Sequence, residues 1–267
     1  MLDLQSQWQQ ILMTVALLMS RMAIAFSIIP IFVGNSIPPS IRIAFVAGLS
    51  TALLPFALQD AATASLPLTS LLLYVGKEAV IGLVLGLVAS VGFWALYVAG
   101  TIIEYQTGLS FATTVDPMSG QEDSLVGTLF MRLFTTLFLI AGGLLSLISM
   151  LFDSYRIWPL SSLQPLASDL AVVQLLVSTV LNLVIIAVKV AAPFVIIMLL
   201  LEVAVGFLSR FAPQLNVFFV TLPLKVLVLA IMLLAYGTII AANGDWLPMM
   251  RFDNALAPLE RATPATP

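Results

Sequence analysis

Six long apolar blocks limit what this 267-residue chain can fold into. They cover residues 11–33, 41–58, 71–103, 129–152, 170–201 and 217–242. An α-helix of about 20 apolar residues is long enough to cross the hydrocarbon core of a bilayer. The chain is 61% hydrophobic and only 9% charged, whereas a soluble domain carries about 25% charged residues. The sequence therefore predicts an all-α membrane protein of about six long, partly kinked helices arranged in hairpins.

The composition removes most enzyme chemistry from consideration. The sequence has no Cys and no His, which excludes disulfides, thiol nucleophiles, imidazole acid–base catalysis and most transition-metal sites. No polar stretch is long enough to form a separate soluble domain. The net charge is −3 and no basic patch is present, so the electrostatic attraction that binds nucleic acid is missing. We expect no catalytic residues, no metal, no cofactor and no nucleic-acid partner.

A polar interruption divides the apolar sequence near its middle. Residues 104–127 read EYQTGLSFATTVDPMSGQEDSLVG and include four acidic residues but no Lys or Arg. Gly108, Pro117 and Gly120 argue against one continuous helix, because Pro lacks an N–H donor and Gly adds backbone freedom. Unpaired backbone groups cost several kcal/mol each in lipid. The segment is therefore either a loop in water or a segment buried in protein beside a water-filled path.

Most basic residues lie within the apolar blocks rather than between them, with Arg21, Lys189 and Lys225 deepest. Each costs about 2.5–3.5 kcal/mol at the centre of a membrane helix. We expect them to find partners in the helix bundle, in water or in another subunit, and hypothesise that several pair across subunit boundaries. Lys77 and Glu78 are not expected to face each other, because they are neighbours in one helix. The candidate buried or subunit-contact charges are Arg21, Glu104, Lys189, Glu202, Arg210 and Lys225.

Small residues at helical spacing predict close helix contacts in two blocks. In the third block they are Gly82, Gly86 and Ser90, and in the fourth Gly142, Ser146 and Ser149.

Prolines inside or next to the apolar blocks, at positions 30, 55, 193 and 223, indicate kinks or helix ends. Broken helices are also typical of secondary transporters. A small-solute secondary transporter or channel is therefore an alternative function for this chain.

Two stretches resemble one protein family. Residues 108–120, GLSFATTVDPMSG, and residues 209–225, SRFAPQLNVFFVTLPLK, are similar to the FliR/SctT family of type III secretion export-gate components. GLSFATTVDP is closer to the flagellar FliR form. PMSGQEDSLVG, the SYRIWP run at 154–159 and LNVFFVTLPLK are closer to the injectisome SctT form, which we favour.

The resemblance implies a subunit of a helical hetero-oligomeric export gate, with a conduit and plug for unfolded substrate proteins. It implies that residues 106–122 form the plug, with Phe111 and Met118 helping to close the pore, and that 213–216 turn a helical hairpin. The plug residues are Gly108, Leu109, Ser110, Phe111, Asp116, Pro117, Met118 and Gly120, and the turn residues are Pro213, Gln214 and Asn216.

Organisation, partners and location also follow as expectations. Residues 1–242 are expected to form one all-helical domain and residues 243–267 a polar, flexible tail. The implied partners are the P/R-type and Q/S-type export-gate membrane proteins, the switch/autoprotease export component, the large export-gate protein, unfolded secreted substrates and membrane lipid. The implied location is the bacterial inner membrane, as a multi-pass protein, with much of the complex at periplasmic level.

Overall fold

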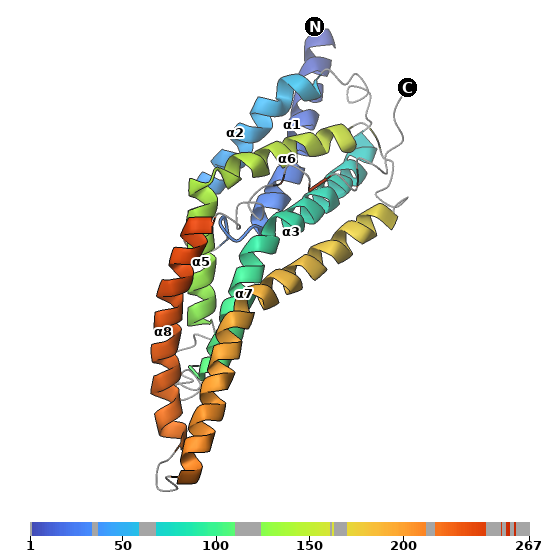
Figure 1. Cartoon of the computed structure of the whole chain (residues 1–267). Helices are drawn as coiled ribbons and strands as arrows, with labels where there is room; N and C mark the ends of the chain where they lie inside the picture. The colour runs from blue at the N-terminus through green and yellow to red at the C-terminus, as the bar shows by residue number, and fades with distance from the viewer. Residues whose placement is uncertain are drawn as a thin grey trace, which may run out of the picture. The chain divides into compact units, whose positions relative to one another are not determined.

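A computed structural model describes residues 2–33, 37–58, 68–109, 124–160, 162, 170–211, 217–243, 252, 255, 256 and 259. All secondary structure in these ranges is α-helical, which confirms the predicted fold class (Figure 1). Seven helices are present in the described part of the chain, against about six predicted. They are α1 (Leu2–Ile28), α2 (Pro39–Ala57), α3 (Leu68–Thr107), α5 (Leu125–Ile140), α6 (Gly143–Ile157), α7 (Leu170–Phe211) and α8 (Val217–Asn243).

The additional helix arises from a break in the fourth apolar block, which was expected to be continuous. Helix α5 ends at Ile140, and Gly142 has a φ of 77°. This left-handed conformation is strained for residues with a side chain and common for glycine. The close contact predicted at Gly142 is wrong, because no atom of the described residues lies within 4 Å of a Cβ built there, whereas the Ser146 hydroxyl accepts from the Phe252 N–H at 2.8 Å. This glycine serves to end a helix.

Four segments in the described ranges have the length and composition to cross a membrane. They are Gln10–Ile28, Pro39–Ala57, Leu71–Thr107 and Ala171–Phe211, and α5 with α6 would make a fifth if the pair counts as one span. Helices α2, α7 and α8 continue through Pro55, Pro193 and Pro223. Helix α1 ends at Ile28, just before Pro30, as the sequence predicted. These spans describe a multi-pass membrane protein.

The chain forms two compact units. Unit 1 comprises residues 1–91, 142–180 and 251–267, and unit 2 comprises residues 92–141 and 181–250.

In unit 1, the small-residue face of α3 packs against α1, which confirms the contact predicted at Gly82, Gly86 and Ser90. A Cβ at Gly82 would overlap the backbone carbonyl oxygen of Arg21, and one at Gly86 would lie 2.9 Å from that of Ala25. The Ser90 hydroxyl lies 3.4 Å from the carbonyl oxygen of Ile28. The two helix backbones therefore touch over two turns, which only residues of this size permit.

In unit 2, four helices contribute to one apolar core. The buried residues at its centre are Ala99, Ile103, Val126, Phe130, Ala187, Ala191, Phe194, Met198 and Leu229. Helices α3 and α5 cross at Gly100 and Gly127, where a Cβ at Gly100 would lie 2.6 Å from the Cα of Gly127. This crossing brings the end of α3 close to the beginning of α5, and thereby fixes both ends of the polar mid-chain segment.

Candidate functional site

The polar mid-chain segment begins where α3 ends, at Gly108. The Gly108 N–H donates to the Glu104 carbonyl oxygen at 3.1 Å, and the Thr107 hydroxyl donates to the same oxygen at 2.7 Å. Gly108 has a φ of 80°, the left-handed conformation that ends many helices and that glycine adopts without strain. The glycine expected from the sequence to break the helix therefore does so at the first residue after α3.

The carboxylate of Glu104 connects the end of α3 to the beginning of α5. Glu104 is only 6% exposed. Its Oε2 accepts hydrogen bonds from the Ser124 hydroxyl at 2.6 Å and from the Val126 N–H at 2.8 Å. Ser124 is the N-cap of α5, and its Oγ accepts from the Gly127 N–H at 2.9 Å. Unpaired N–H groups at a helix N-terminus favour a negative charge, so the carboxylate stabilises this end of α5.

Lys225 of α8 contacts the C-terminal end of α3, where the polar mid-chain segment begins. It is 5% exposed, and its Nζ donates to the carbonyl oxygen of Gln106 at 2.7 Å. It also forms an ion pair with Glu202 of α7. The Gln106 amide lies within 3.5 Å of Glu202 Oε2. A cation at the last carbonyls of a helix is favourable for the same reason that an anion is at its beginning. We call Glu104, Gln106, Ser124, Glu202 and Lys225 the loop root.

The loop root brings together two parts of the sequence that are far apart. Lys225 is the last residue of the 209–225 motif, and Gln106 lies just before the 108–120 motif. An anion faces the N-terminus of α5 and a cation faces the C-terminus of α3, and each such interaction contributes typically about 0.3–1 kcal/mol. The ends of the segment are thus fixed by charge and by hydrogen bonds.

Several predicted plug and turn residues lie outside the described residues. Of the plug residues, Gly108 and Leu109 are described, and Leu109 packs against the core of unit 2. Those outside are Ser110, Phe111, Asp116, Pro117, Met118 and Gly120, together with the turn residues Pro213, Gln214 and Asn216. Helix α3 ends at Thr107 and α5 begins at Leu125, close to the limits expected for a loop at 106–122.

Two loop-root residues were missed at the level of sequence. Ser124 had a usable signal, because a serine directly before an apolar helical segment is a typical N-cap. Gln106 had none, because its backbone carbonyl makes the contact to Lys225.

Unit 1 contains a second buried cluster of charges around Arg21, which is 0% exposed. Its Nε lies 2.6 Å from Glu78 Oε2, and its Nη1 donates to the Ser154 hydroxyl at 3.0 Å. Its Nη2 donates to the carbonyl oxygen of Trp158 at 2.8 Å. The guanidinium carbon also lies 3.9 Å from the ring centroid of Tyr155. Arg21 therefore joins α1 to α3 and to the C-terminal end of α6.

Lys77 belongs to the same cluster. Its Nζ lies 2.8 Å from Glu78 Oε1, in an ion pair without hydrogen-bond geometry, and donates to the carbonyl oxygens of Pro159 and Ser162, each at 2.9 Å. The expectation that Lys77 and Glu78 do not face each other is wrong, because the long lysine side chain bends toward its neighbour. One carboxylate thus pairs with two cations.

The predicted charges differ in how they are satisfied. Arg21 and Lys225 find carboxylates within this chain, so the hypothesis of pairing across subunits is not needed for them. Lys189 and Arg210 are exposed and make no hydrogen bond or ion pair through their side chains with any described residue. For these two, pairing with another subunit stays a prediction.

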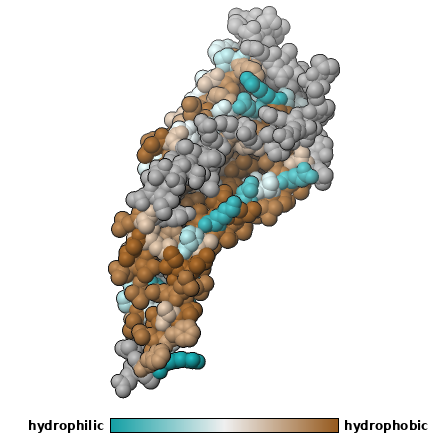
Figure 2. All heavy atoms as spheres, in the orientation of Figure 1, coloured by the Kyte–Doolittle hydropathy of each residue, from teal (hydrophilic) through white to brown (hydrophobic). Residues whose placement is uncertain are grey.

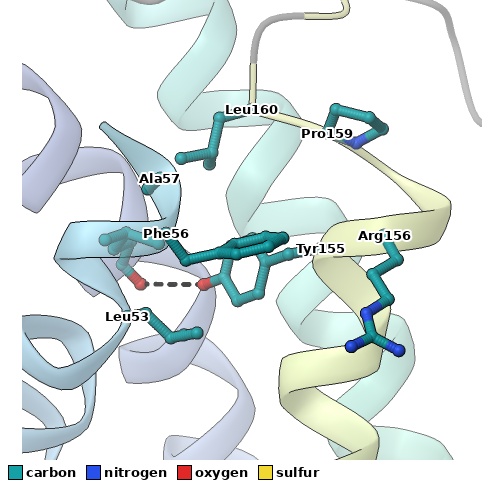
Figure 3. Close-up of a pocket in the computed structure, with 8 residues that line it drawn as sticks. Leu53, Phe56, Ala57, Tyr155, Arg156, Pro159 and Leu160 are labelled. Atoms are coloured by element: carbon teal, nitrogen blue, oxygen red, sulfur yellow. Dashed lines mark hydrogen bonds between the residues drawn. The ribbon is translucent and has the colours of Figure 1, made fainter. Parts of the chain in front are cut away.

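Unit 1 also contains a cavity of about 430 Å³ between α1, α2 and the end of α6 (Figure 3). The Tyr155 hydroxyl donates to the carbonyl oxygen of Leu18 at 3.3 Å at its wall. The Arg156 side chain is 76% exposed and pairs with Asp153 of its own helix. The lining residues are Leu18, Leu53, Phe56, Ala57, Tyr155, Arg156, Pro159 and Leu160. These contacts indicate a gap in apolar packing.

Comparisons with known proteins agree with the resemblance seen in the motifs. Residues 12–244 match the family described as bacterial export proteins, family 1. The chain is 34% identical over 229 residues to Yop proteins translocation protein T of Yersinia pestis, covering 85% of this chain and 87% of that protein. It is 32% identical over 207 residues to surface presentation of antigens protein SpaR of Shigella flexneri, covering 77% of each chain. It is 30% identical over 220 residues to flagellar biosynthetic protein FliR of Bacillus subtilis, covering 82% of this chain and 84% of that one.

Proposed function

This chain belongs to family 1 of the bacterial export proteins, and we propose that it is a gate subunit through which unfolded proteins leave the cell in a type III system. The similarity extends across most of the chain and of its relatives, which include both secretion and flagellar proteins. Identity to the Yersinia protein is 34% and to the Bacillus flagellar protein 30%, over similar lengths. We place the chain in the injectisome branch because of its motifs, the SYRIWP run at 154–159 and LNVFFVTLPLK at 215–225.

In this proposal the mid-chain loop is the plug of the conduit. The observation that carries it is the loop root, where Glu104 and Lys225 fix the two ends of residues 108–123 from opposite sides. A stopper that opens and recloses needs fixed ends, so that it returns to the same position. Phe111 and Met118 would supply the apolar contacts that seal the conduit, and the glycines at 108 and 120 the backbone freedom to open it.

The proposed assembly includes the P/R-type and Q/S-type membrane proteins as direct neighbours. The switch/autoprotease component and the large export-gate protein would act beside them. The complex would sit in the bacterial inner membrane, with much of it at periplasmic level. Residues 1–242 would work together as the gate domain, with 243–267 as a tail. The family match and the multi-pass helices support the membrane location.

The prolines give the transporter alternative little support. Helices α2, α7 and α8 continue through Pro55, Pro193 and Pro223, whereas α1 ends just before Pro30 and the break between α5 and α6 lies at Gly142. No observation on the described residues favours a small-solute site.

Deleting residues 110–119 tests the plug. In the assembled complex, reconstituted in a planar bilayer, the deletion should raise the conductance for small ions, because the stopper is gone while the loop root remains. Deletion of residues 61–65, in the connection between α2 and α3, is the control and should leave conductance at the wild-type level. An unchanged conductance in an intact complex lacking 110–119 would show that the segment does not close a passage.

A second pair of variants tests the loop root itself. Glu104→Leu removes the acceptor for Ser124 and Val126, whereas Glu104→Gln keeps a side-chain oxygen there. We expect Glu104→Leu to leak more than Glu104→Gln. Equal leakage of the two would mean that these hydrogen bonds do not hold the plug in place.

A further inference from the structure

From residue 181 onward, helix α7 has one face in the core of unit 2 and an opposite face whose described side chains are exposed. Ala187, Ala191, Phe194 and Met198 are buried in that core. Residues in an α-helix follow one another at about 100° around the axis, so Lys189 lies about 200° from Ala187. Its side chain is exposed and makes no hydrogen bond or ion pair with any described residue. The cation therefore points away from the unit that holds its helix.

The surroundings of Lys189 on α7 are apolar in both directions along the helix. Ile185 and Val188 precede it and Ile196 and Leu200 follow it, and all four are exposed. Lys189 lies 18 residues into the spanning segment Ala171–Phe211, which is about 27 Å of helix. A cation in such a belt would cost about 2.5–3.5 kcal/mol if it faced lipid. This arrangement calls for a negative partner.

The backbone carbonyl of the same residue lacks its usual helical donor. Pro193 lies inside α7 and has no N–H, so it cannot donate to the carbonyl oxygen of Lys189, which is four residues earlier. Asn182 is exposed two turns before Lys189 and thus lies on nearly the same face. Figure 2 shows a row of hydrophilic residues, in teal, beside apolar surface. Position 189 thus offers an ammonium group and an acceptor without its usual helical donor.

We propose that this face of α7, centred on Lys189, docks a transmembrane helix of another export-gate subunit that carries a carboxylate. The carboxylate pairs with the Lys189 ammonium, and a hydroxyl or amide near it donates to the Lys189 carbonyl. The occupant is a helix because the apolar flanks need apolar cover, and a helix satisfies its own backbone in lipid. A water-filled passage would instead expose the apolar side chains of Ile185, Val188 and Ile196 to water. The inference rests on the proposed function and names the chemistry of one contact within it.

Co-purification from membranes tests the contact. The full chain, tagged, is co-expressed with its P/R-type and Q/S-type partners, and the retained partners are quantified after detergent extraction. Lys189→Met should reduce the retained partner about tenfold or more, because it leaves the partner's carboxylate buried and unpaired. Lys189→Arg should retain the wild-type amount. Lys189→Glu should lose the partner, and one Asp or Glu→Lys change in a partner helix should restore it.

Two controls make the result specific. Arg156→Met removes another exposed cation, but one that pairs with Asp153 of its own helix, and should leave retention unchanged. The combined Asp116→Asn, Glu122→Gln and Asp123→Asn variant removes acids of the mid-chain segment. If it reproduces the loss seen with Lys189→Met, the carboxylate belongs to this chain and the inference is overturned.

The outcomes also separate the inference from the proposed function. If the wild-type chain retains neither partner, the proposed function fails. If the wild type retains both, and Lys189→Met and Lys189→Glu retain them equally well, only the docking inference fails. If Lys189→Met and Lys189→Arg both lost the partner, packing rather than charge would explain the contact at this position. The proposed charge pairing would then also be overturned.

Discussion

At the scale of single residues, Arg21 and its partner Glu78 are both fully buried charges. The Arg21 guanidinium is satisfied by Glu78, Ser154 and Trp158 together. Removing one partner of a buried ion pair leaves an unpaired charge, which typically costs about 3–5 kcal/mol. Glu78→Met leaves the buried Arg21 guanidinium without a carboxylate, so we expect it to lower the free energy of unfolding by that amount, measured by denaturant titration in mixed micelles.

The double variant Arg21→Met with Glu78→Met is the control for this charge effect. Replacing both partners removes the buried guanidinium as well, and Lys77 keeps its backbone acceptors at Pro159 and Ser162, so the double variant should be more stable than Glu78→Met alone. If the double variant lost at least as much stability as the sum of the two single changes, packing rather than charge would explain the role of Arg21.

At the scale of helices, the crossing of α3 and α5 depends on two glycines. A Cβ at Gly100 would lie 2.6 Å from both the Cα of Gly127 and the carbonyl oxygen of Val126. These are backbone atoms, so the helices must separate to accept a methyl group. We expect Gly100→Ala to lower the free energy of unfolding by about 1–3 kcal/mol, the usual cost of overpacking, measured in the same micelle titration.

Gly76→Ala is a matched control on the same helix. Among the residues that the structure describes, no atom lies within 4 Å of a Cβ at Gly76, so the substitution adds only the helical preference of alanine over glycine, about 0.5–1 kcal/mol. Stability should stay the same or rise slightly. Equal losses for the two variants would mean that glycine flexibility, rather than close approach of α3 to α5, decides the effect.

At the scale of the whole molecule, the helices differ in how much of their surface the chain itself covers. In an 18-residue apolar stretch of α3, 56% of the residues are buried, but only 22% are buried in the corresponding stretches of α2 and of α7. Helix faces that carry charges and are little covered by this chain need lipid or partner helices to cover them. We expect the chain expressed without its P/R-type and Q/S-type partners to be degraded several-fold faster than with them, measured by pulse–chase.

Co-expression with an unrelated multi-pass membrane protein is the control, because it loads the membrane equally without offering the matching helices. The half-life should then remain short. A half-life that is the same in all three conditions would indicate that the chain is stable alone, as expected for a transporter.

The sequence by itself determined the fold class, the family and the local structural features of this protein. The apolar blocks indicated a membrane protein, because a chain with so few charged residues cannot form the surface of a soluble domain. The spacing of Gly82, Gly86 and Ser90 predicted a close helix contact, since periodicity shows which residues share a face. Gly108 predicted the end of α3. Each of these inferences depends on residues that are neighbours along the chain.

Only the tertiary structure decided which charges meet. Arg21 and Glu78 are 57 positions apart, and Lys225 lies 119 positions from the Gln106 carbonyl that it contacts. Helical periodicity says that a charge lies on a face, but it does not say which other helix packs there. The break at Gly142 was equally hidden, because a glycine in an apolar block serves either as a contact or as a helix end. Its left-handed φ and the empty space around it show that it ends a helix.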